Sequence, residues 1–339
     1  MQTVRMGVLG AANIGRKVVI PSILRARNAE LVAIGSTSEA GERFLRESEL
    51  TLRDGRPLRE GVRAHGSYEE LLADDGVEAV YIPLPNHLHL EWSKRAADAG
   101  KHVLCEKPAA LDAEQTAEMI EHCQRRGVVW MEAFMYRFHP QWQVVRGLLD
   151  EGAIGELRTV RALFTFTVRD PRNIRRRRET GGGSLYDVGS YCVNVSRLLV
   201  GRPPRRASGL MQESEQGVDE EFQGLLDFGG NQTALFLSSL SQPYRHEVNV
   251  LGTSGSITVP TAFVLGSQDV EVVHVDGEGA ERRITVPGDD EYRLQVEHFA
   301  ECVLSGSEPS VVSHEDTLAN MRTIDALYAS ARSGRVVEL

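Results

Sequence analysis

The sequence predicts an α/β protein in two parts: a doubly wound parallel sheet, then an α+β domain with a large, mainly antiparallel open sheet. Three observations support this class. Buried-strand and helix patterns alternate up to about residue 135. After residue 203 strand-like alternation dominates, and helices no longer separate the strands. The 339 residues exceed one ordinary core, so two domains are expected, at 1–135 and 136–339.

Composition and charge narrow the functional class. The chain is 41% hydrophobic and 25% charged, as in soluble globular proteins, and it carries a formal net charge of −10. That charge argues against nucleic acid as the main partner. Four scattered cysteines without CxxC spacing indicate free thiols in a reducing compartment. Since neither a leader peptide nor an apolar run of membrane-spanning length is recognisable, we expect a cytoplasmic protein without membrane contact.

The first strand and the turn after it predict a dinucleotide site. A buried strand begins at Val4, residues 10–15 (GAANIG) form the turn, and a helix runs to about Ala26. This pattern resembles GxGxxG with Ala12 in the second glycine place. Gly10 permits the turn, Ala12 lets a pyrophosphate approach the backbone, and Gly15 lets the helix pack closely. The helix N-terminus offers N–H groups to phosphates. Asn13 and Ile14 complete the predicted contacts.

The end of the second strand bears on the choice between NADP and NAD. The strand is predicted from Glu30 to Ser36, and Thr37 and Ser38 follow it. NAD-binding folds usually place a carboxylate near this point to hold the ribose 2′-hydroxyl. Without that carboxylate nothing repels a 2′-phosphate, and hydroxyl groups can donate to it. NADP is therefore favoured and NAD stays open, because no arginine directly follows Ser36 and Arg43 lies further on.

The remaining elements of the first part continue the alternation. We expect a loop at 48–61 and strands at 77–83, 102–105 and 128–132. Helices are expected at 68–73, from a cap at Asn86 to about 99 with His89 early in it, and from a cap at Asp112 to about 126. His87 and His89 form an HxH pair, but no third ligand stands at metal spacing, so no metal is expected.

Residues 100–108 (GKHVLCEKP) form an apolar strand that ends in two opposite charges and a proline. The carboxyl edge of an open α/β sheet is where ligands bind. Pro108 cannot continue a ladder and restricts Lys107 to a non-helical pose. An ammonium held there can donate to a substrate oxygen and help move a proton. The alternative is a surface lysine that only ends a strand.

The second part reads as strands followed by two closing helices. A helix to about Leu149 precedes it. Strands are predicted at 157–168, 219–228, 232–241, 246–252, 255–259, 270–275 and 282–286, and helices at 290–304 and 315–332. Such runs predict an antiparallel or mixed sheet with helices on one side. The other face needs a cover, so a homodimer or homotetramer through this sheet is expected.

Two further stretches are candidates for chemistry. Residues 172–178 are a basic run, which is either a solvated loop or a cationic flap over cofactor phosphates or substrate, with Arg175 as the candidate substrate contact. Residues 181–191 place three glycines before a helix on which Asp187 and Tyr191 share one face. Both side chains can then point into a cleft. Alternatively Asp187 caps the helix and Tyr191 packs.

Together these motifs resemble the Gfo/Idh/MocA family of oxidoreductases along nearly the whole chain. The motifs are residues 10–15, Pro85-Asn86 with His89, residues 99–108 through Glu106-Lys107-Pro108, Tyr136-Arg137, and residues 181–191. The resemblance implies an N-terminal Rossmann dinucleotide-binding domain and a C-terminal α/β domain with a large open sheet for substrate binding and oligomerisation. It further implies hydride transfer between NAD(P) and a small-molecule sugar or polyol.

The resemblance also implies roles for single residues. Lys107 would contact the reacting oxygen and the nicotinamide ribose, Tyr191 would donate or accept the proton, and Asp187 would orient the substrate or Lys107. Cofactor contacts would come from Ser36, Thr37, Leu84, Asn86, His89, Glu106 and Arg137. Tyr191, where inositol dehydrogenase-like members carry histidine, resembles the branch with glucose–fructose oxidoreductase, dihydrodiol or xylose dehydrogenases and ketosugar reductases, which mostly uses NADP.

Two alternative functions remain open. One is NAD-assisted non-redox sugar chemistry such as glycoside cleavage, and the other is a non-catalytic, cofactor-bound sensor. Sensors of this family tend to lose the lysine of Glu-Lys-Pro, whereas this chain keeps Lys107. A short-chain dehydrogenase is not expected, because neither Tyr186 nor Tyr191 has a lysine four residues later.

Overall fold

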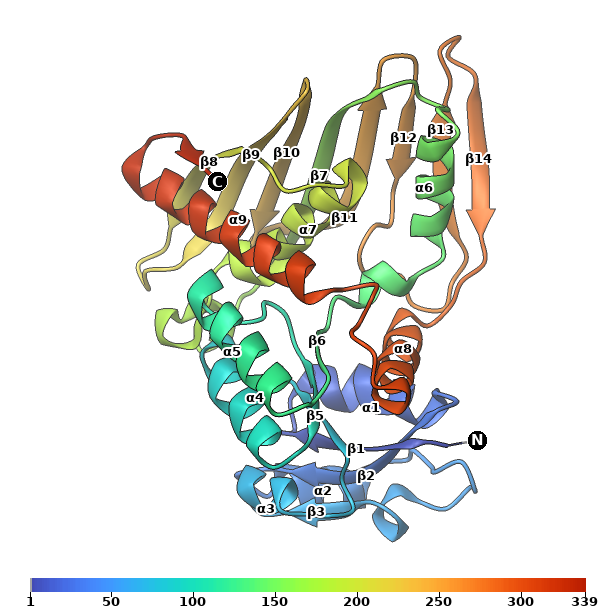
Figure 1. Ribbon diagram of the computed structural model, residues 1–339, viewed down its shortest axis with the longest axis vertical. Helices are drawn as coiled ribbons and strands as arrows, with labels where there is room; N and C mark the ends of the chain where they lie inside the picture. Colours follow the sequence, from blue (N-terminus) through green and yellow to red (C-terminus); the bar gives the residue numbers. More distant parts are fainter. Residues whose placement is uncertain (1) are drawn as a thin grey trace. The chain divides into compact units, whose positions relative to one another are not determined.

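The computed structural model describes residues 2–339 and divides them into two compact units (Figure 1). The first comprises the residues up to Ala110, Glu114–Phe138 and Asp290–Thr317. The second comprises Leu111–Ala113, His139–Asp289 and Leu318–Leu339. The division of roles between 1–135 and 136–339 stays a prediction. No helix of residues 2–339 is long and apolar enough to cross a membrane, and all four cysteines are buried free thiols.

The first unit is built on a parallel sheet with the strand order β3-β2-β1-β4-β5-β6. Its strands are β1 (Val4–Leu9), β2 (Ala29–Gly35), β3 (Arg63–His65), β4 (Ala79–Ile82), β5 (His102–Cys105) and β6 (Trp130–Glu132). Every neighbouring pair is parallel. Strand β3 was not predicted, because its three residues are largely exposed and carry no apolar pattern. The order reverses between β1 and β4, where doubly wound sheets bind ligands.

The helices of this unit follow the predicted alternation except for α2, which was not predicted. They are α1 (Ile20–Arg25), α2 (Ala40–Glu47), α3 (Tyr68–Leu72), α4 (His89–Asp98), α5 (Ala113–Arg125) and α8 (Glu291–Ser305). A π-helical turn, Gly15–Val19, leads into α1. Figure 1 shows α8 beside α1, and Asn28 Nδ2 donates to the Glu297 main-chain oxygen at 2.9 Å. The periodicity of the sequence predicted this late helix but not the core that it joins.

The second unit contains a nine-stranded sheet in the order β14-β13-β12-β11-β7-β10-β9-β8-β15. Its strands are β7 (Leu157–Thr167), β8 (Arg206–Glu213), β9 (Asp219–Gly229), β10 (Gln232–Ser239), β11 (Ser241–Gly252), β12 (Ser256–Val259), β13 (Val270–Val275), β14 (Glu281–Val286) and β15 (Val337–Glu338). Only β7 and β10 pair in parallel among these neighbours. The predicted fold class is confirmed, with β8 and β15 as additional strands.

One face of this sheet is covered by helices. Figure 1 shows α6 (Gln141–Asp150), α7 (Ser190–Val200) and α9 (His314–Ser333) on the same side. Along β7 the side chains of Val160, Ala162 and Phe164 are buried toward these helices. Arg161 and Leu163 alternate with them and point to the opposite face. The predicted arrangement, with helices on one side of the sheet, is thus what the structure shows.

Candidate active site

The turn after β1 requires glycine at its first position. Gly10 has φ of +105°, which side chains rarely adopt, and a Cβ there would lie 3.2 Å from Leu84 Cδ2. The Gly10 amide donates to the Gly35 oxygen at 2.7 Å, which ties the turn to the end of β2. Asn13 is exposed and accepts from Arg16 Nη2 at 3.0 Å, while Ala12 and Ile14 are half-buried. These small residues at a helix start fit a pyrophosphate.

The end of β2 carries hydroxyl groups. Ser36 is only 5% exposed, and its Oγ accepts from the Ser38 amide at 3.4 Å. Thr37 is exposed, and its side chain is hydrogen-bonded to the Tyr68 hydroxyl. That hydroxyl would lie 3.5 Å from a Cβ on Gly10, so Tyr68 belongs to the edge of the dinucleotide turn. The sequence pattern marked Tyr68 only as the start of a helix.

Glu106 and Lys107, which follow β5, are held in place by a buried residue of the neighbouring strand β4. Tyr81 is fully buried on β4, and its hydroxyl donates to Glu106 Oε1 at 2.6 Å. The Lys107 amide donates to Glu106 Oε2 at 3.3 Å. Lys107 is half-buried and precedes a cis peptide bond to Pro108. The Tyr81 hydroxyl thus fixes the Glu106 carboxylate, which in turn holds the backbone that presents Lys107.

His89 ties two loops of the predicted cofactor edge together. It is fully buried, with Nδ1 at 2.8 Å from the Pro108 oxygen and Nε2 at 2.8 Å from the Leu84 oxygen. Burial lowers the pKa of His89 and the Lys107 ammonium lowers it further, while the two carbonyl groups act in the opposite direction. Asn86 begins the 3-10 turn Asn86–Leu88 between β4 and α4. These contacts make His89 a support for the Lys107–Pro108 turn.

Arg137 lies on the 3-10 turn Met135–Phe138 and is held inside the first unit. Its Nη1 donates to Asp316 Oδ2 at 2.8 Å, and its Nη2 donates to the Val311 oxygen at 2.7 Å. The side chain is 11% exposed. The guanidinium is therefore anchored by partners that lie far along the chain, which the sequence pattern did not indicate.

In the second unit, Asp219 anchors the glycine-rich stretch. Its Oδ2 accepts from Ser184 Oγ at 2.8 Å and from the Leu185 amide at 2.7 Å. Its Oδ1 accepts from the Tyr328 hydroxyl at 2.7 Å, and burial raises the pKa of Asp219 to about 6. Gly183 has φ of +123°, and a Cβ there would collide with Asp219 Oδ1. Glycine is needed because this carboxylate approaches so closely.

The predicted pair of ionisable groups lies on the helical stretch that follows. The π-helical turn Leu185–Gly189 carries Asp187 and leads into α7, which carries Tyr191. Asp187 Oδ2 accepts from Arg175 Nε at 2.7 Å, and the guanidinium lies 5.9 Å from the centre of the Phe166 ring. Other arginines of the basic run pair with carboxylates: Arg172 with Asp170, Arg176 with Glu220, and Arg177 with Glu179.

Tyr191 is 5% exposed and packs in an aromatic cluster on the covered face of the sheet. Its ring centre lies 5.4 Å from that of Phe164 and 5.4 Å from that of Phe263. The structure therefore pairs Arg175 with Asp187, and it packs the Tyr191 ring against Phe164 and Phe263. Within the first unit, Gly10 lies beside Leu84 and the Tyr68 hydroxyl, and the Lys107 amide donates to Glu106. The convergence of Lys107 with Asp187 and Tyr191 stays a prediction.

A parallel sheet with a glycine turn after its first strand, followed by a second sheet domain with an ionisable pair, is the architecture of two-domain NAD(P)-dependent oxidoreductases. Residues 4–134 match the oxidoreductase family with an NAD-binding Rossmann fold, and residues 142–258 match the GFO/IDH/MocA C-terminal domain. The chain belongs to the Gfo/Idh/MocA family and is an NAD(P)-dependent dehydrogenase or reductase.

Similar proteins span the whole chain. D-xylose 1-dehydrogenase (NADP(+)) 2 of Haloferax volcanii is 40% identical over 98% of this chain and 99% of its own. A 3-ketoreductase from Actinomadura kijaniata, solved with NADP and TDP-benzene, superposes with a TM-score of 0.89 at 30% identity, covering 97% and 98% of the two chains. An aldose-aldose oxidoreductase from Caulobacter crescentus, solved with glycerol, has a TM-score of 0.88 at 28% identity, covering 100% of both. The predicted family is confirmed.

Proposed function

We propose that this protein transfers hydride between NADP and a carbon of a sugar or polyol, with Lys107 and Tyr191 handling the proton. The observation that carries the proposal is Tyr191, whose ring is fixed by Phe164 and Phe263 one helical turn from Asp187. The substrate class is supported by the similar proteins, which are named for xylose, aldoses and a dTDP-linked ketosugar.

The proton is handled by this chain's own side chains. NADP, when bound, supplies the hydride acceptor at nicotinamide C4. Tyr191 takes the hydroxyl proton during oxidation and returns it during reduction. A free phenol has a pKa near 10, so the Lys107 ammonium has to favour the phenolate. Asp187 is already paired with Arg175, which suits it to orient the substrate rather than to act as the base.

NADP is proposed over NAD for two reasons. The end of β2 offers hydroxyls, with Thr37 and Ser38 exposed, where NAD-specific folds place a carboxylate. The xylose dehydrogenase that is 40% identical is named for NADP, and the ketoreductase was solved with it. Arg43 is exposed and has no ion-pair partner among residues 2–339, which makes it the candidate cation for the 2′-phosphate.

The test is a panel of aldoses and polyols with NADP and NAD, read by absorbance at the nicotinamide band. The parent should turn over at least one sugar, and Lys107→Met should lower kcat about a hundredfold or more. NADPH binding, measured by fluorescence, should stay within about threefold of the parent. Lys94→Met is the matched control, since Lys94 pairs with Glu118 on the surface of α4 and α5. Turnover within about tenfold of the parent would remove Lys107 from proton transfer.

The same panel separates the two alternatives. Glycosides of the same sugars are added to the panel, and release of the free sugar without net reduction of the cofactor would support the non-redox chemistry. NADPH binding without turnover of any sugar would support a sensor. The presence of Lys107, Asp187 and Tyr191 counts against the sensor, while the absorbance of the cofactor decides the non-redox alternative.

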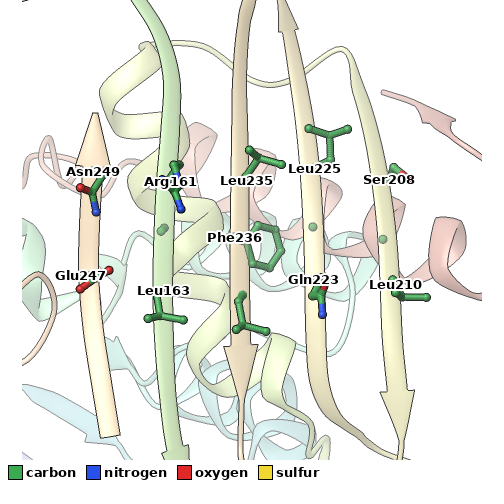
Figure 2. A pocket seen from close by; sticks show the side chains of 14 residues that line it. Arg161, Leu163, Ser208, Leu210, Gln223, Leu225, Leu235, Phe236, Glu247 and Asn249 are labelled. Atoms are coloured by element: carbon green, nitrogen blue, oxygen red, sulfur yellow. The ribbon is translucent and has the colours of Figure 1, made fainter. Parts of the chain in front are cut away.

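A second copy of the chain is the proposed cover for the open face of the nine-stranded sheet. Figure 2 shows leucine side chains on neighbouring strands of this face, and Leu210, Leu225 and Leu235 are 63%, 43% and 45% exposed. They line a groove of about 600 Å³ together with Arg161 and Glu247. A broad apolar face that carries both charges can pair with itself about a two-fold axis. Sedimentation of the purified protein tests this proposal.

A further inference from the structure

Strand β11 brings a histidine into the aromatic cluster that holds Tyr191. His246 pairs across the ladder with Phe164, and the two ring centres are 5.4 Å apart. The Phe164 and Phe263 rings stack with centres 5.3 Å apart, and Tyr191 contacts both of them. His246 also lies 6.4 Å from the Phe263 ring. His246 and Tyr191 therefore pack against the same pair of phenylalanines.

The backbone determines which nitrogen of His246 carries the proton. Nδ1 accepts from the Ala262 amide at 3.1 Å and from the Phe263 amide at 3.2 Å. An accepting nitrogen bears no hydrogen, so the hydrogen of the neutral ring is on Nε2. Burial lowers the pKa of His246 to about 4, which keeps the ring neutral near pH 7. The side chain thus presents an uncharged donor in one defined tautomer.

That donor has no acceptor among the residues that the structure describes. His246 is 8% exposed, and no residue in the described range 2–339 accepts a hydrogen bond from Nε2. Nε2 is not one of the fully enclosed polar atoms that lack a partner, so this nitrogen is open to a ligand. Tyr244, on the same strand, has its ring centre 5.1 Å from that of His246 and is 59% exposed. An uncharged donor among aromatic rings is suited to a sugar, whose C–H faces pack on rings and whose hydroxyls accept hydrogen bonds.

We propose that Nε2–H of His246 donates to a hydroxyl oxygen of the sugar away from the reacting carbon, and so helps to set which sugar is accepted. The inference rests on the proposed function and deepens it. It assigns to His246 a binding role that neither the motifs nor the similar proteins' names indicate. Because the His246 ring is neutral, it distinguishes sugars by the position of a hydroxyl group and not by their charge.

Two substitutions separate this role from a merely structural one. In His246→Asn the amide oxygen can still accept from the Ala262 and Phe263 amides, but no donor reaches the Nε2 position. In His246→Gln the amide nitrogen reaches that position as a donor, while the acceptor for the two main-chain amides is lost. The measurements are kcat and KM for the best aldose of the panel, the Kd of NADPH by fluorescence, and Tm.

Asn at this position should lower kcat/KM about tenfold, mainly through KM, with Tm and the NADPH Kd unchanged. Gln should lower Tm but keep more of kcat/KM than Asn does. A series of monodeoxy analogues of the same aldose adds a second readout. The kcat/KM of the parent should be about tenfold lower with one analogue than with the aldose itself. For His246→Asn, kcat/KM should be the same with that analogue and with the aldose. If Asn behaves like the parent with every sugar, or if losses of kcat/KM simply follow losses of Tm, the inference is wrong.

Failure of the proposed function is distinguishable from failure of this inference. If the parent turns over no sugar, that function fails. The same aldoses are then titrated into the NADPH-loaded parent and into the loaded His246→Asn variant by calorimetry. Weaker binding by the variant would support the role of His246. Equal binding, or binding by neither protein, would overturn it.

Discussion

The two faces of the nine-stranded sheet are made by the same strands but differ in chemistry. On the covered face, β7 and β11 contribute Phe164 and His246, which lie in the cluster around Tyr191. On the open face the adjacent residues Leu163 and Glu247 line a broad groove with exposed leucines (Figure 2). Side chains alternate along a strand, so adjacent residues point to opposite faces of the sheet. One of these faces is the proposed substrate surface, and the other is the proposed subunit interface. Substitutions on the two faces should therefore have separable effects.

The largest effect is expected on the covered face, at Tyr191. Tyr191→Phe removes the proton-transfer group but keeps the ring that packs on Phe164 and Phe263. We expect kcat to fall roughly a thousandfold, within the usual range for an acid–base residue. Steady-state kinetics measure this, with Tm and NADPH binding as controls for folding. A loss smaller than about tenfold would assign the proton to another group.

A smaller effect is expected from the buried carboxylate of the covered side, Asp219. Its pKa is raised from 3.8 to about 6, so between these values the folded state binds more protons than the unfolded state. Stability supplied by this group is therefore present below about pH 4 and is lost as the pH rises toward 6. The free energy of unfolding should fall by roughly 3 kcal/mol from this group. Urea unfolding at several pH values should show a smaller decline in Asp219→Asn than in the parent. Part of the decline stays in the variant, because burial also raises the pKa of Asp325 to about 6.

Asp227, on the same strand, is the matched control for that experiment. The Gly229 amide and Arg206 lower the pKa of Asp227, so its contribution has the opposite sign and is lost as the pH falls. Asp227→Asn should keep the parent's decline between pH 4 and 6. If Asp219→Asn and Asp227→Asn show the same pH dependence, burial is not what shifts Asp219.

On the open face, Leu235→Lys should change assembly and leave chemistry nearly intact. A charge in the middle of an apolar interface is unfavourable, so the variant should sediment as a smaller species than the parent. Its kcat should stay within about threefold of the parent, because the side chain points away from Tyr191. Leu304→Lys is the control, since Leu304 on α8 is 41% exposed, close to the 45% of Leu235. Unchanged sedimentation of Leu235→Lys would exclude this face as the interface.

The smallest effect is expected at Glu247, next to His246 on β11. Glu247 pairs with Arg245 at 2.7 Å on the open face, where exposed ion pairs contribute about 0–1 kcal/mol. Glu247→Gln should therefore change kcat/KM less than twofold, against about tenfold for His246→Asn. Kinetics of these two neighbouring variants compare the faces directly, and similar losses in both would contradict the separation.

Local patterns in the sequence predicted the parts of the fold that depend on neighbours along the chain. The alternation of strands and helices, the turn at Gly10, and the shared helical face of Asp187 and Tyr191 all follow from short-range periodicity. Strand β3 escaped prediction because three residues carry too little pattern, and β8 because most of its side chains are half-buried or exposed. The candidate residues Lys107, Asp187 and Tyr191 came from motifs, and their roles are still to be measured.

The supporting residues could not be predicted, because each depends on a distant partner. Tyr81 holds Glu106 across the sheet, and Tyr328 reaches Asp219 from a helix 109 residues later. His246 becomes a defined donor only because the Ala262 and Phe263 amides meet its other nitrogen.

The sequence by itself determined the two-part α/β class, the dinucleotide turn and the ionisable groups, since these rest on local geometry and side-chain chemistry. The tertiary structure decided which groups are buried, which are paired and which face of a strand meets the cluster around Tyr191. Burial and pairing are properties of contacts between distant segments, so no local pattern contains them.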